Sequence, residues 1–284
     1  MIEFLTRPLP PPASVEVIRF PAGEPHVVQS EPGSLTGDCV ALLRGCDSDD
    51  LVTALLWSSA VHSDGGRPHL LVPYLPGARA DRAPRLEARV YAELLNTGRF
   101  ETVVALDPHS PVMPGLLHRL EAVGADELVD RFLPRALRAD LAGVIAPDEG
   151  AAQRAGSVAR RLDVPVFQAR KHRDFRSGRL NGFSCEPLPA AGELLVVDDI
   201  CDGGGTFMGL ASVIPEAAGR LHLWVTHGVF SGAATALTQA YRSIMCTDSH
   251  PGCHGVPGAQ VFACGETMLE RIGLADAMSE GDEQ

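Results

Sequence analysis

The sequence predicts an α/β fold, because short apolar segments alternate with longer amphipathic segments along most of the chain. Strands and helices in alternation form largely parallel sheets that are covered by helices on both faces. The chain has 284 residues, of which 45% are hydrophobic, so it can build one large core or two ordinary ones. Two similar rounds follow one another along the chain, which favours two tandem domains.

The individual elements follow from this pattern in chain order. The Pro- and Gly-rich N-terminal part, about 35 residues, predicts an extended strand or a hairpin before the first round. The predicted strands are 39–43, 69–74 and 102–107 in the first round, then 143–148, 164–169, 193–199, 221–227 and 243–248. The predicted helices are 49–63, 85–98, 150–163 and 206–219. The stretch DRFLPRALRAD is a connection, and it suggests domains of 1–137 and 138–284.

The composition excludes several classes of function. A net charge of -12 argues against a sequence-blind nucleic-acid binder, which needs a basic face for the phosphates. A small phosphorylated ligand is compatible with this charge, since a few local cations or a metal ion offset the global field. The sequence has neither a membrane span nor a signal-peptide pattern, so we expect a soluble protein of the cytoplasm.

The seven cysteines are scattered and odd in number, which does not suggest a disulfide framework. Cys246, Cys253 and His254 lie close together in CTDSHPGCH, but their spacing fits no common zinc pattern. Metal ligands and ordinary loop cysteines both remain open there.

The most informative stretch is LLVVDDICDGGGT, residues 194–206. Ligands of an open parallel sheet bind beyond the carboxyl ends of its strands, so Asp198 and Asp199 are presented at a binding crevice. The three glycines let the backbone approach a ligand closely, and amides at the start of the next helix bind phosphate. The stretch lacks the lysine of a P-loop and the spacing of a dinucleotide-binding turn. It therefore indicates a sugar phosphate, with an ordinary strand-turn-helix junction as the alternative.

This stretch resembles the ribose 5-phosphate motif of the phosphoribosyltransferase superfamily. The order of the remaining motifs resembles ribose-phosphate pyrophosphokinases over nearly the whole chain, although each motif is weak alone. These motifs are FPAGEPHV (20–27), VPYLPGARADR (72–82), LDPHS (106–110), IAPDEGAAQRAGSVARRLDVP (145–165), KHR (171–173) and VTHGVFSGAA (225–234). The resemblance implies two tandem phosphoribosyltransferase-like domains with an N-terminal hairpin.

The resemblance also implies an activity, in which the β,γ-diphosphate of ATP moves to the 1-hydroxyl of ribose 5-phosphate and AMP is released. Such a transfer needs cations, Mg²⁺ and a dry pocket. Lys171 and Arg173 would be the catalytic cations of a flap that closes over the triphosphate. The residues expected to bind ribose 5-phosphate are Asp198, Asp199, Asp202, Gly203, Gly204, Gly205 and Thr206.

For the nucleotide, the resemblance implies four residues of the first round. Phe20 and Glu24 would hold the adenine, and in the family these hairpin positions reach the site of a neighbouring subunit, which implies a homo-oligomer. Arg79 would bind the triphosphate. His109 and Asp148 resemble positions at the magnesium-triphosphate, where carboxylate oxygen is the better magnesium ligand.

Three positions depart from the family pattern. Ala22 and Ala80 replace an acid and a glutamine of the nucleotide pocket, and Gly203 replaces a threonine of the phosphate loop. These changes leave open a variant that acts on ADP-ribose and serves NAD salvage. A phosphoribosyltransferase and a non-catalytic, synthetase-like subunit are the alternatives from other classes. The second α/β round counts against the former, and the retained cations and acids count against the latter.

Overall fold

The computed structural model describes residues 2–6, 15–44, 47–81, 87–173 and 180–274. Contacts between residues divide the chain into two compact units. The first comprises residues 1–123 and 264–284, and the second comprises residues 124–263. Both are α/β units with mostly parallel sheets, as predicted.

Within the described residues, the first unit contains a five-stranded sheet in the order β1-β4-β5-β6-β7. The strands β4 to β7 are parallel, while β1 joins the edge antiparallel to β4. A separate antiparallel pair, β2-β3, is the hairpin expected before the first round. The strands are β1 (Ile2–Thr6), β2 (Val15–Arg19), β3 (Pro25–Gln29), β4 (Asp38–Leu43), β5 (Arg67–Val72), β6 (Thr102–Leu106) and β7 (Leu120–Val123).

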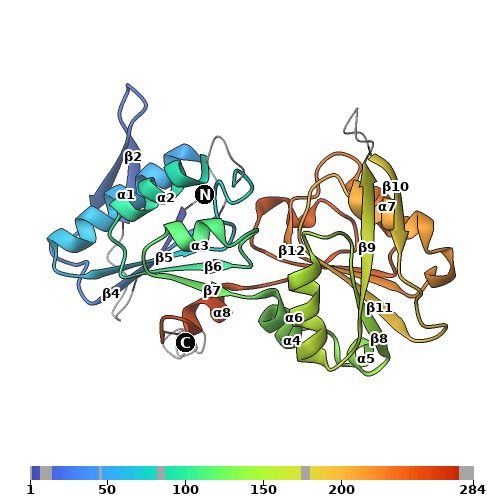
Figure 1. The fold of residues 1–284 in the computed structure, drawn as a ribbon. Coiled ribbons are helices and arrows are strands. Elements are labelled where there is room, and N and C mark those ends of the chain that lie inside the picture. The colour runs from blue at the N-terminus through green and yellow to red at the C-terminus, as the bar shows by residue number, and fades with distance from the viewer. Residues whose placement is uncertain (1, 7–14, 45–46, 82–86, 174–179, 275–284) are drawn as a thin grey trace. The chain divides into compact units, whose positions relative to one another are not determined.

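The helices of the first unit are α1 (Ser48–Ser63), α2 (Glu87–Thr97), α3 (Val112–Leu116) and α8 (Gly265–Glu270). In Figure 1, α1, α2 and α3 lie on one side of the sheet and α8 lies on the other. The carboxylate of Asp47 begins α1 by accepting the amide of Asp49, as expected of an N-cap. Trp57 of α1 is fully buried against alternate residues of the strands, such as Ala41 and Leu43 of β4.

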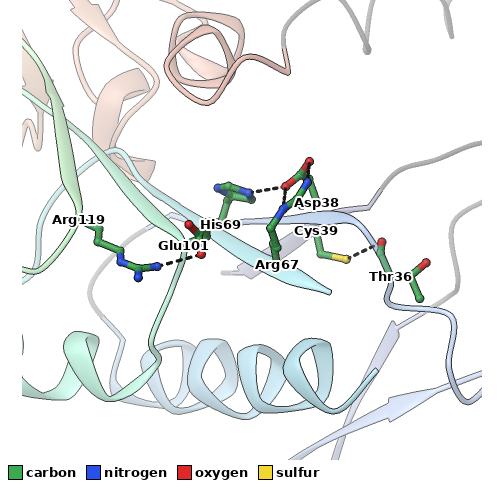
Figure 2. Close-up of polar contacts among 7 residues, drawn as sticks. All are labelled: Thr36, Asp38, Cys39, Arg67, His69, Glu101 and Arg119. Atoms are coloured by element: carbon green, nitrogen blue, oxygen red, sulfur yellow. Dashed lines mark hydrogen bonds and ion pairs between the residues drawn. The ribbon is translucent and has the colours of Figure 1, made fainter. Parts of the chain in front are cut away.

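The amino ends of β4 and β5 carry a polar network (Figure 2). Asp38 begins β4, and its carboxylate accepts hydrogen bonds from Nε and Nη2 of Arg67 at 2.7 and 2.6 Å. Nε2 of His69 lies 3.0 Å from the same carboxylate. The hydrogen bond from Arg67 is the main reason why the pKa of Asp38 falls from 3.8 to about 2. This network lies at the edge opposite the carboxyl ends, so it stabilises the sheet rather than forming the predicted site.

Replacing Asp38 by Asn is expected to lower the free energy of unfolding by about 1 kcal/mol at pH 7, a figure that allows for solvent screening. The folded-state pKa is depressed, so this stability is present above pH 3.8 and is lost as the pH falls toward 2. Urea denaturation at pH 7, 5 and 3 should therefore show that the difference in the free energy of unfolding between the variant and the wild type becomes smaller below pH 5. A difference that stays constant with pH would contradict this assignment.

The second unit contains a seven-stranded sheet, in the order β10-β9-β8-β11-β12-β13-β14 among the described residues. All neighbouring pairs are parallel except β10-β9. The strands are β8 (Leu141–Ala146), β9 (Val166–Arg173), β10 (Leu180–Cys185), β11 (Glu193–Cys201), β12 (Leu221–Gly228), β13 (Ser243–Thr247) and β14 (Gln260–Phe262).

Helices cover both faces of this sheet. The α-helices are α4 (Ala125–Phe132), α5 (Arg135–Ala139), α6 (Ala152–Leu162) and α7 (Gly205–Val213), and the 3₁₀ turns are η1 (Pro215–Ala217), η2 (Ala234–Gln239) and η3 (Pro251–His254). Phe207 and Leu210 of α7 pack on one face, with Val196 of β11. The helices α4 and α6 lie side by side, and α6 contacts β8 and β11.

Several element boundaries differ from those expected, and two of these differences lie next to the predicted site. The predicted helix 206–219 ends at Val213, because Ile214 leaves the helical conformation and Pro215 starts a 3₁₀ turn. The predicted strand 164–169 extends to Arg173, because antiparallel pairing with β10 continues it. The segment KHR, expected to be a loop, is therefore the end of β9.

The division into units also differs from the expected boundary at 137/138. The structure places α4 and α5 in the second unit, where Asp130 of α4 accepts from Arg138 of α5 and Arg161 of α6. Residues from 264 onward belong with the first unit, in which α8 contacts β6. The chain thus returns to the first unit at its end.

Across the described ranges, no helix combines the length and apolarity of a membrane-spanning segment. Cys246 lies in β13 rather than in a loop, and burial raises the pKa of the Cys201 and Cys246 thiols to about 12. Among the residues with described side chains, no three or more His, Cys, Asp or Glu are grouped as a metal site. This includes Cys246, Cys253 and His254.

Candidate functional site

The carboxyl ends of β8, β9 and β11 meet at one edge of the second unit, because these strands are neighbours in its sheet. Asp148 follows β8, Lys171 lies near the end of β9, and Asp198 and Asp199 lie near the end of β11. The fold thus brings together four of the residues predicted from the sequence. The edge is the one at which ligands of open α/β sheets bind.

Lys171 and Asp148 form an ion pair, with the lysine Nζ 2.5 Å from Oδ2 of the carboxylate. The other carboxylate oxygen of Asp148 accepts the backbone amide of Ala151 at 3.1 Å, which holds the turn before α6. The side chain of Lys171 is 20% exposed, so its charge is partly withdrawn from water. A cation in such surroundings acts on a bound anion more strongly than a solvated one.

Asp198 and Asp199 form a buried acidic pair. Their carboxylates share a third partner, Arg154 of α6, whose NH1 lies 3.7 Å from Asp198 Oδ1 and 3.6 Å from Asp199 Oδ1. Burial, followed by the charge of Asp199, raises the pKa of Asp198 well above its ordinary value, and Arg154 opposes the rise. The charge of Asp148 also acts on Asp198, so these carboxylates belong to one cluster.

The glycine-rich loop after β11 leads directly into α7. Gly204 has a φ of 77°, which favours glycine, and a Cβ there would lie 3.2 Å from Leu237. A Cβ on Gly203 or Gly205 would meet nothing within 4 Å, so the backbone at these two positions borders open space. Together with the amides at the start of α7, which includes Thr206, the loop has the features of an anion-binding turn.

A second loop braces the glycine-rich one. The amides of Val229 and Phe230 both donate to Cys201 O at 3.0 Å, and the Ser231 hydroxyl donates to Asp202 Oδ1 at 2.5 Å. Phe230 has a φ of 46°, an uncommon conformation for an aromatic residue. The carboxylate of Asp202 therefore helps to hold the two loops together, and its role as a sugar-phosphate ligand stays a prediction.

The β9-β10 hairpin packs against α7 through one close contact. Phe183 of β10 is paired with Lys171 of β9, so both side chains lie on the same face of the hairpin. A Cβ on Gly209 of α7 would overlap the Phe183 ring. Only a glycine at 209 lets the ring lie this close to the helix. The contact places the strand that carries Lys171 beside the helix that follows the glycine-rich loop.

Replacing Gly209 by Ala is expected to destabilise the second unit by about 1 to 3 kcal/mol through overpacking, although alanine is the better helix former. Phe183→Leu should relieve part of this loss. The double variant would then be more stable than the sum of the two single changes predicts, as measured by urea denaturation in a double-mutant cycle. Additive effects would contradict the contact.

Arg173 is the last residue of β9, and its backbone is paired with Leu180 of β10. The side chain of Arg173 lies outside what the structure describes, so its predicted catalytic role stays a prediction.

The remaining predicted residues belong to the first unit. Phe20 and Glu24 lie at the exposed tip of the β2-β3 hairpin, where the amide of Phe20 donates to Glu24 O at 3.1 Å. The Phe20 ring is 45% exposed, with its centroid 5.3 Å from that of His26. Arg79 is exposed in the segment after β5, and His109 lies half-buried after β6. Both of these follow carboxyl ends of parallel strands, as predicted.

Comparison with known proteins supports the same interpretation. Residues 142–250 match the model of the phosphoribosyl transferase domain. A ribose-phosphate pyrophosphokinase of Agrobacterium fabrum is 28% identical, covering 88% of this chain and 83% of its own length. One from Brucella melitensis is 28% identical, covering 95% and 90%. The fold resembles phosphoribosylpyrophosphate synthetase from Mycobacterium smegmatis, with a TM-score of 0.78, 22% identity, and coverage of 93% and 91%.

The matched domain and the loop between β11 and α7 define an α/β protein of the phosphoribosyltransferase type. The relatives that span nearly the whole chain narrow this class. The chain is similar to ribose-phosphate pyrophosphokinases over nearly its whole length. The predicted fold class and the predicted family resemblance are therefore confirmed.

Three residues of the site were not among those predicted. Arg154 and Gly209 lie within helices, and Ser231 lies in a segment whose resemblance was recognised without a role for the serine. The sequence carried no signal for Arg154, because the low exposure of its charged side chain, 10%, is visible only once α6 has been placed on the sheet.

Proposed function

We propose that the protein transfers the β,γ-diphosphate of ATP to the 1-hydroxyl of ribose 5-phosphate, giving phosphoribosyl pyrophosphate and AMP. The observation that carries this proposal is the charged cluster at the ends of β8, β9 and β11, next to a glycine-rich turn. It combines acceptors for sugar hydroxyls, a turn for a phosphate and a cation for a transferred phosphoryl group.

The sugar phosphate would bind to the second unit. Asp198 and Asp199 would accept hydrogen bonds from the vicinal ribose hydroxyls, since ionised carboxylates are strong acceptors. Gly203, Gly204, Gly205 and Thr206 would enclose the 5-phosphate with their amides and the threonine hydroxyl. Asp202 would keep the loop in place through Ser231.

In the transfer, the 1-hydroxyl oxygen bonds to the β-phosphorus of ATP, and the bond from that phosphorus to the α,β-bridging oxygen breaks. AMP leaves, and the hydroxyl proton passes to solvent. Lys171 and Arg173 would neutralise the negative charge that spreads over the phosphoryl oxygens. Asp148 would orient Lys171 through the ion pair described above.

The residues also fit Mg²⁺, which is usually bound by one or two carboxylates together with substrate phosphates and water. Asp148 would supply the carboxylate at the end of β8, and His109 of the first unit would contact a phosphate or a metal-bound water. When bound, the metal ion would offset the charge of the triphosphate.

For the nucleotide, we assign Phe20 and Glu24 to the adenine and Arg79 to the triphosphate. The exposed Phe20 ring at the hairpin tip is suited to stacking on a base. Because the hairpin is a pair of strands apart from the main sheet, it can serve the nucleotide site of a second copy, which makes a homo-oligomer part of this proposal.

The test is to incubate the protein with MgATP and either ribose 5-phosphate or ADP-ribose and to resolve the products by mass spectrometry. The expected result is AMP together with a ribose 5-phosphate product heavier by a diphosphate. The ADP-ribose arm matters because Gly203, one of the departures from the family pattern, borders open space. Diphosphate transfer only to ADP-ribose would show that ADP-ribose, and not ribose 5-phosphate, is the acceptor. The lack of AMP with either acceptor would refute the transferase activity.

A further inference from the structure

Arg154 differs from the other arginines of α6 in its surroundings. Its side chain is 10% exposed, and its guanidinium lies within 3.7 Å of one oxygen of Asp198 and one of Asp199. Arg160 and Arg161 of the same helix lie at the surface. The cation of Arg154 thus lies close to two adjacent carboxylates that are themselves 15% and 5% exposed.

The position of Arg154 is unfavourable unless the acids offset it. It lies in the first turn of α6, where the positive end of the helix dipole repels a cation. Its burial adds the cost of removing a charge from water. The two aspartates supply the offsetting charge, so the three side chains depend on one another.

The dependence also runs in the other direction. Two neighbouring carboxylates of like charge repel each other, and on a regular strand their side chains would turn to opposite faces. Arg154 instead draws one oxygen of each toward the same guanidinium nitrogen. The backbone amide of Asp199 adds a second constraint by donating to Asp198 Oδ1 at 2.9 Å.

We infer that Arg154 is a positioning residue, which holds Asp198 and Asp199 together as the acceptors of the two ribose hydroxyls. This role rests on the function proposed above. The arginine itself need not touch the sugar. Because its charge is close to both carboxylates, Arg154 sets the geometry of the part of the site that would bind the sugar. Other residues would bind ATP.

The experiment measures binding of ribose 5-phosphate and of MgATP separately, by titration calorimetry, to the full-length protein. The variants are Arg154→Met and Arg154→Lys, with Arg160→Met as the matched control on the exposed part of α6. We expect Arg154→Met to lower the affinity for ribose 5-phosphate at least tenfold. Arg154→Lys should lower it by about two- to fivefold, because an ammonium group keeps the charge but lacks the planar fork of a guanidinium. MgATP affinity should stay within about twofold for all three.

Circular dichroism and thermal melting identify the variants that fold as the wild type does. If Arg154→Met does not fold, Arg154→Lys is used for the test. A folded Arg154→Met, or in its absence a folded Arg154→Lys, that binds ribose 5-phosphate as tightly as wild type would overturn the role. An equal loss of affinity for ribose 5-phosphate and for MgATP would also overturn this role, because it would indicate a general structural effect. A wild-type protein that binds MgATP but no ribose 5-phosphate would refute the proposed function and this role with it.

Discussion

Lys171→Ala is expected to lower kcat at least about 100-fold while the protein keeps its native fold, the size of loss typical when one preorganised charge-stabilising group is removed. The reason is local. The Lys171 side chain is mostly withdrawn from water and lies 2.5 Å from Asp148, at the edge where the strand ends converge. No other described side chain forms an ion pair with Asp148. Steady-state production of AMP at saturating MgATP and ribose 5-phosphate measures the effect.

The matched control is Arg170→Ala, the preceding position on β9. Side chains alternate between the faces of a strand, so Arg170 points away from Lys171. Its side chain is 63% exposed, and its contact with Glu149 is long, at 4.0 Å. Turnover of Arg170→Ala should stay within about threefold of wild type, since exposed ion pairs contribute little. Turnover of Lys171→Ala in the same range would show that the lysine lies outside the transfer site.

Asp199→Asn should lower kcat/KM for ribose 5-phosphate by about 10- to 100-fold, with little change in KM for MgATP. An amide replaces an ionised acceptor for a sugar hydroxyl, and it leaves Arg154 with only one acidic partner in this pair. Hydrogen bonds to charged groups contribute about 1.5 to 3 kcal/mol, which corresponds to this loss. The measurement varies ribose 5-phosphate at saturating MgATP, and then MgATP at saturating ribose 5-phosphate.

Asp163→Asn provides the control for the same chemical change. Asp163 is exposed at the end of α6 with a φ of 57°, a conformation that Asn adopts readily. Its kinetic constants should match those of the wild type. If Asp199→Asn raised KM for both substrates alike, the acidic pair would be a structural element of the unit rather than the sugar site.

The sequence predicted the alternation of strands and helices well, and the predicted strand in 193–199 is part of β11. It did not predict β7, β10 or β14, which are short or lie at sheet edges. Short edge strands carry little periodic signal, because fewer of their residues face a core. The end of β9 was predicted as a loop for a related reason, since KHR lacks the apolar pattern that identifies a strand.

The candidate site divides in the same way. Asp148, Lys171, Asp198 and Asp199 could be predicted because each follows or ends an apolar strand, and parallel strands place such residues at one edge. Their catalytic and binding roles stay predictions, as do those of the residues in the first unit. Gly209 could not be predicted, because its reason for being glycine is the Phe183 ring of another element.

The sequence by itself determined the α/β fold and the family resemblance, because strand and helix periods and the order of motifs are local properties of the chain. Only the tertiary structure decided which charges meet. Arg154 lies 44 and 45 residues before Asp198 and Asp199, and their pairing depends on how α6 packs beside β11. The boundary between the units was also decided by packing, since α4 packs against α6, Arg138 of α5 pairs with Asp130 of α4, and the segment from Cys264 onward groups with the first unit.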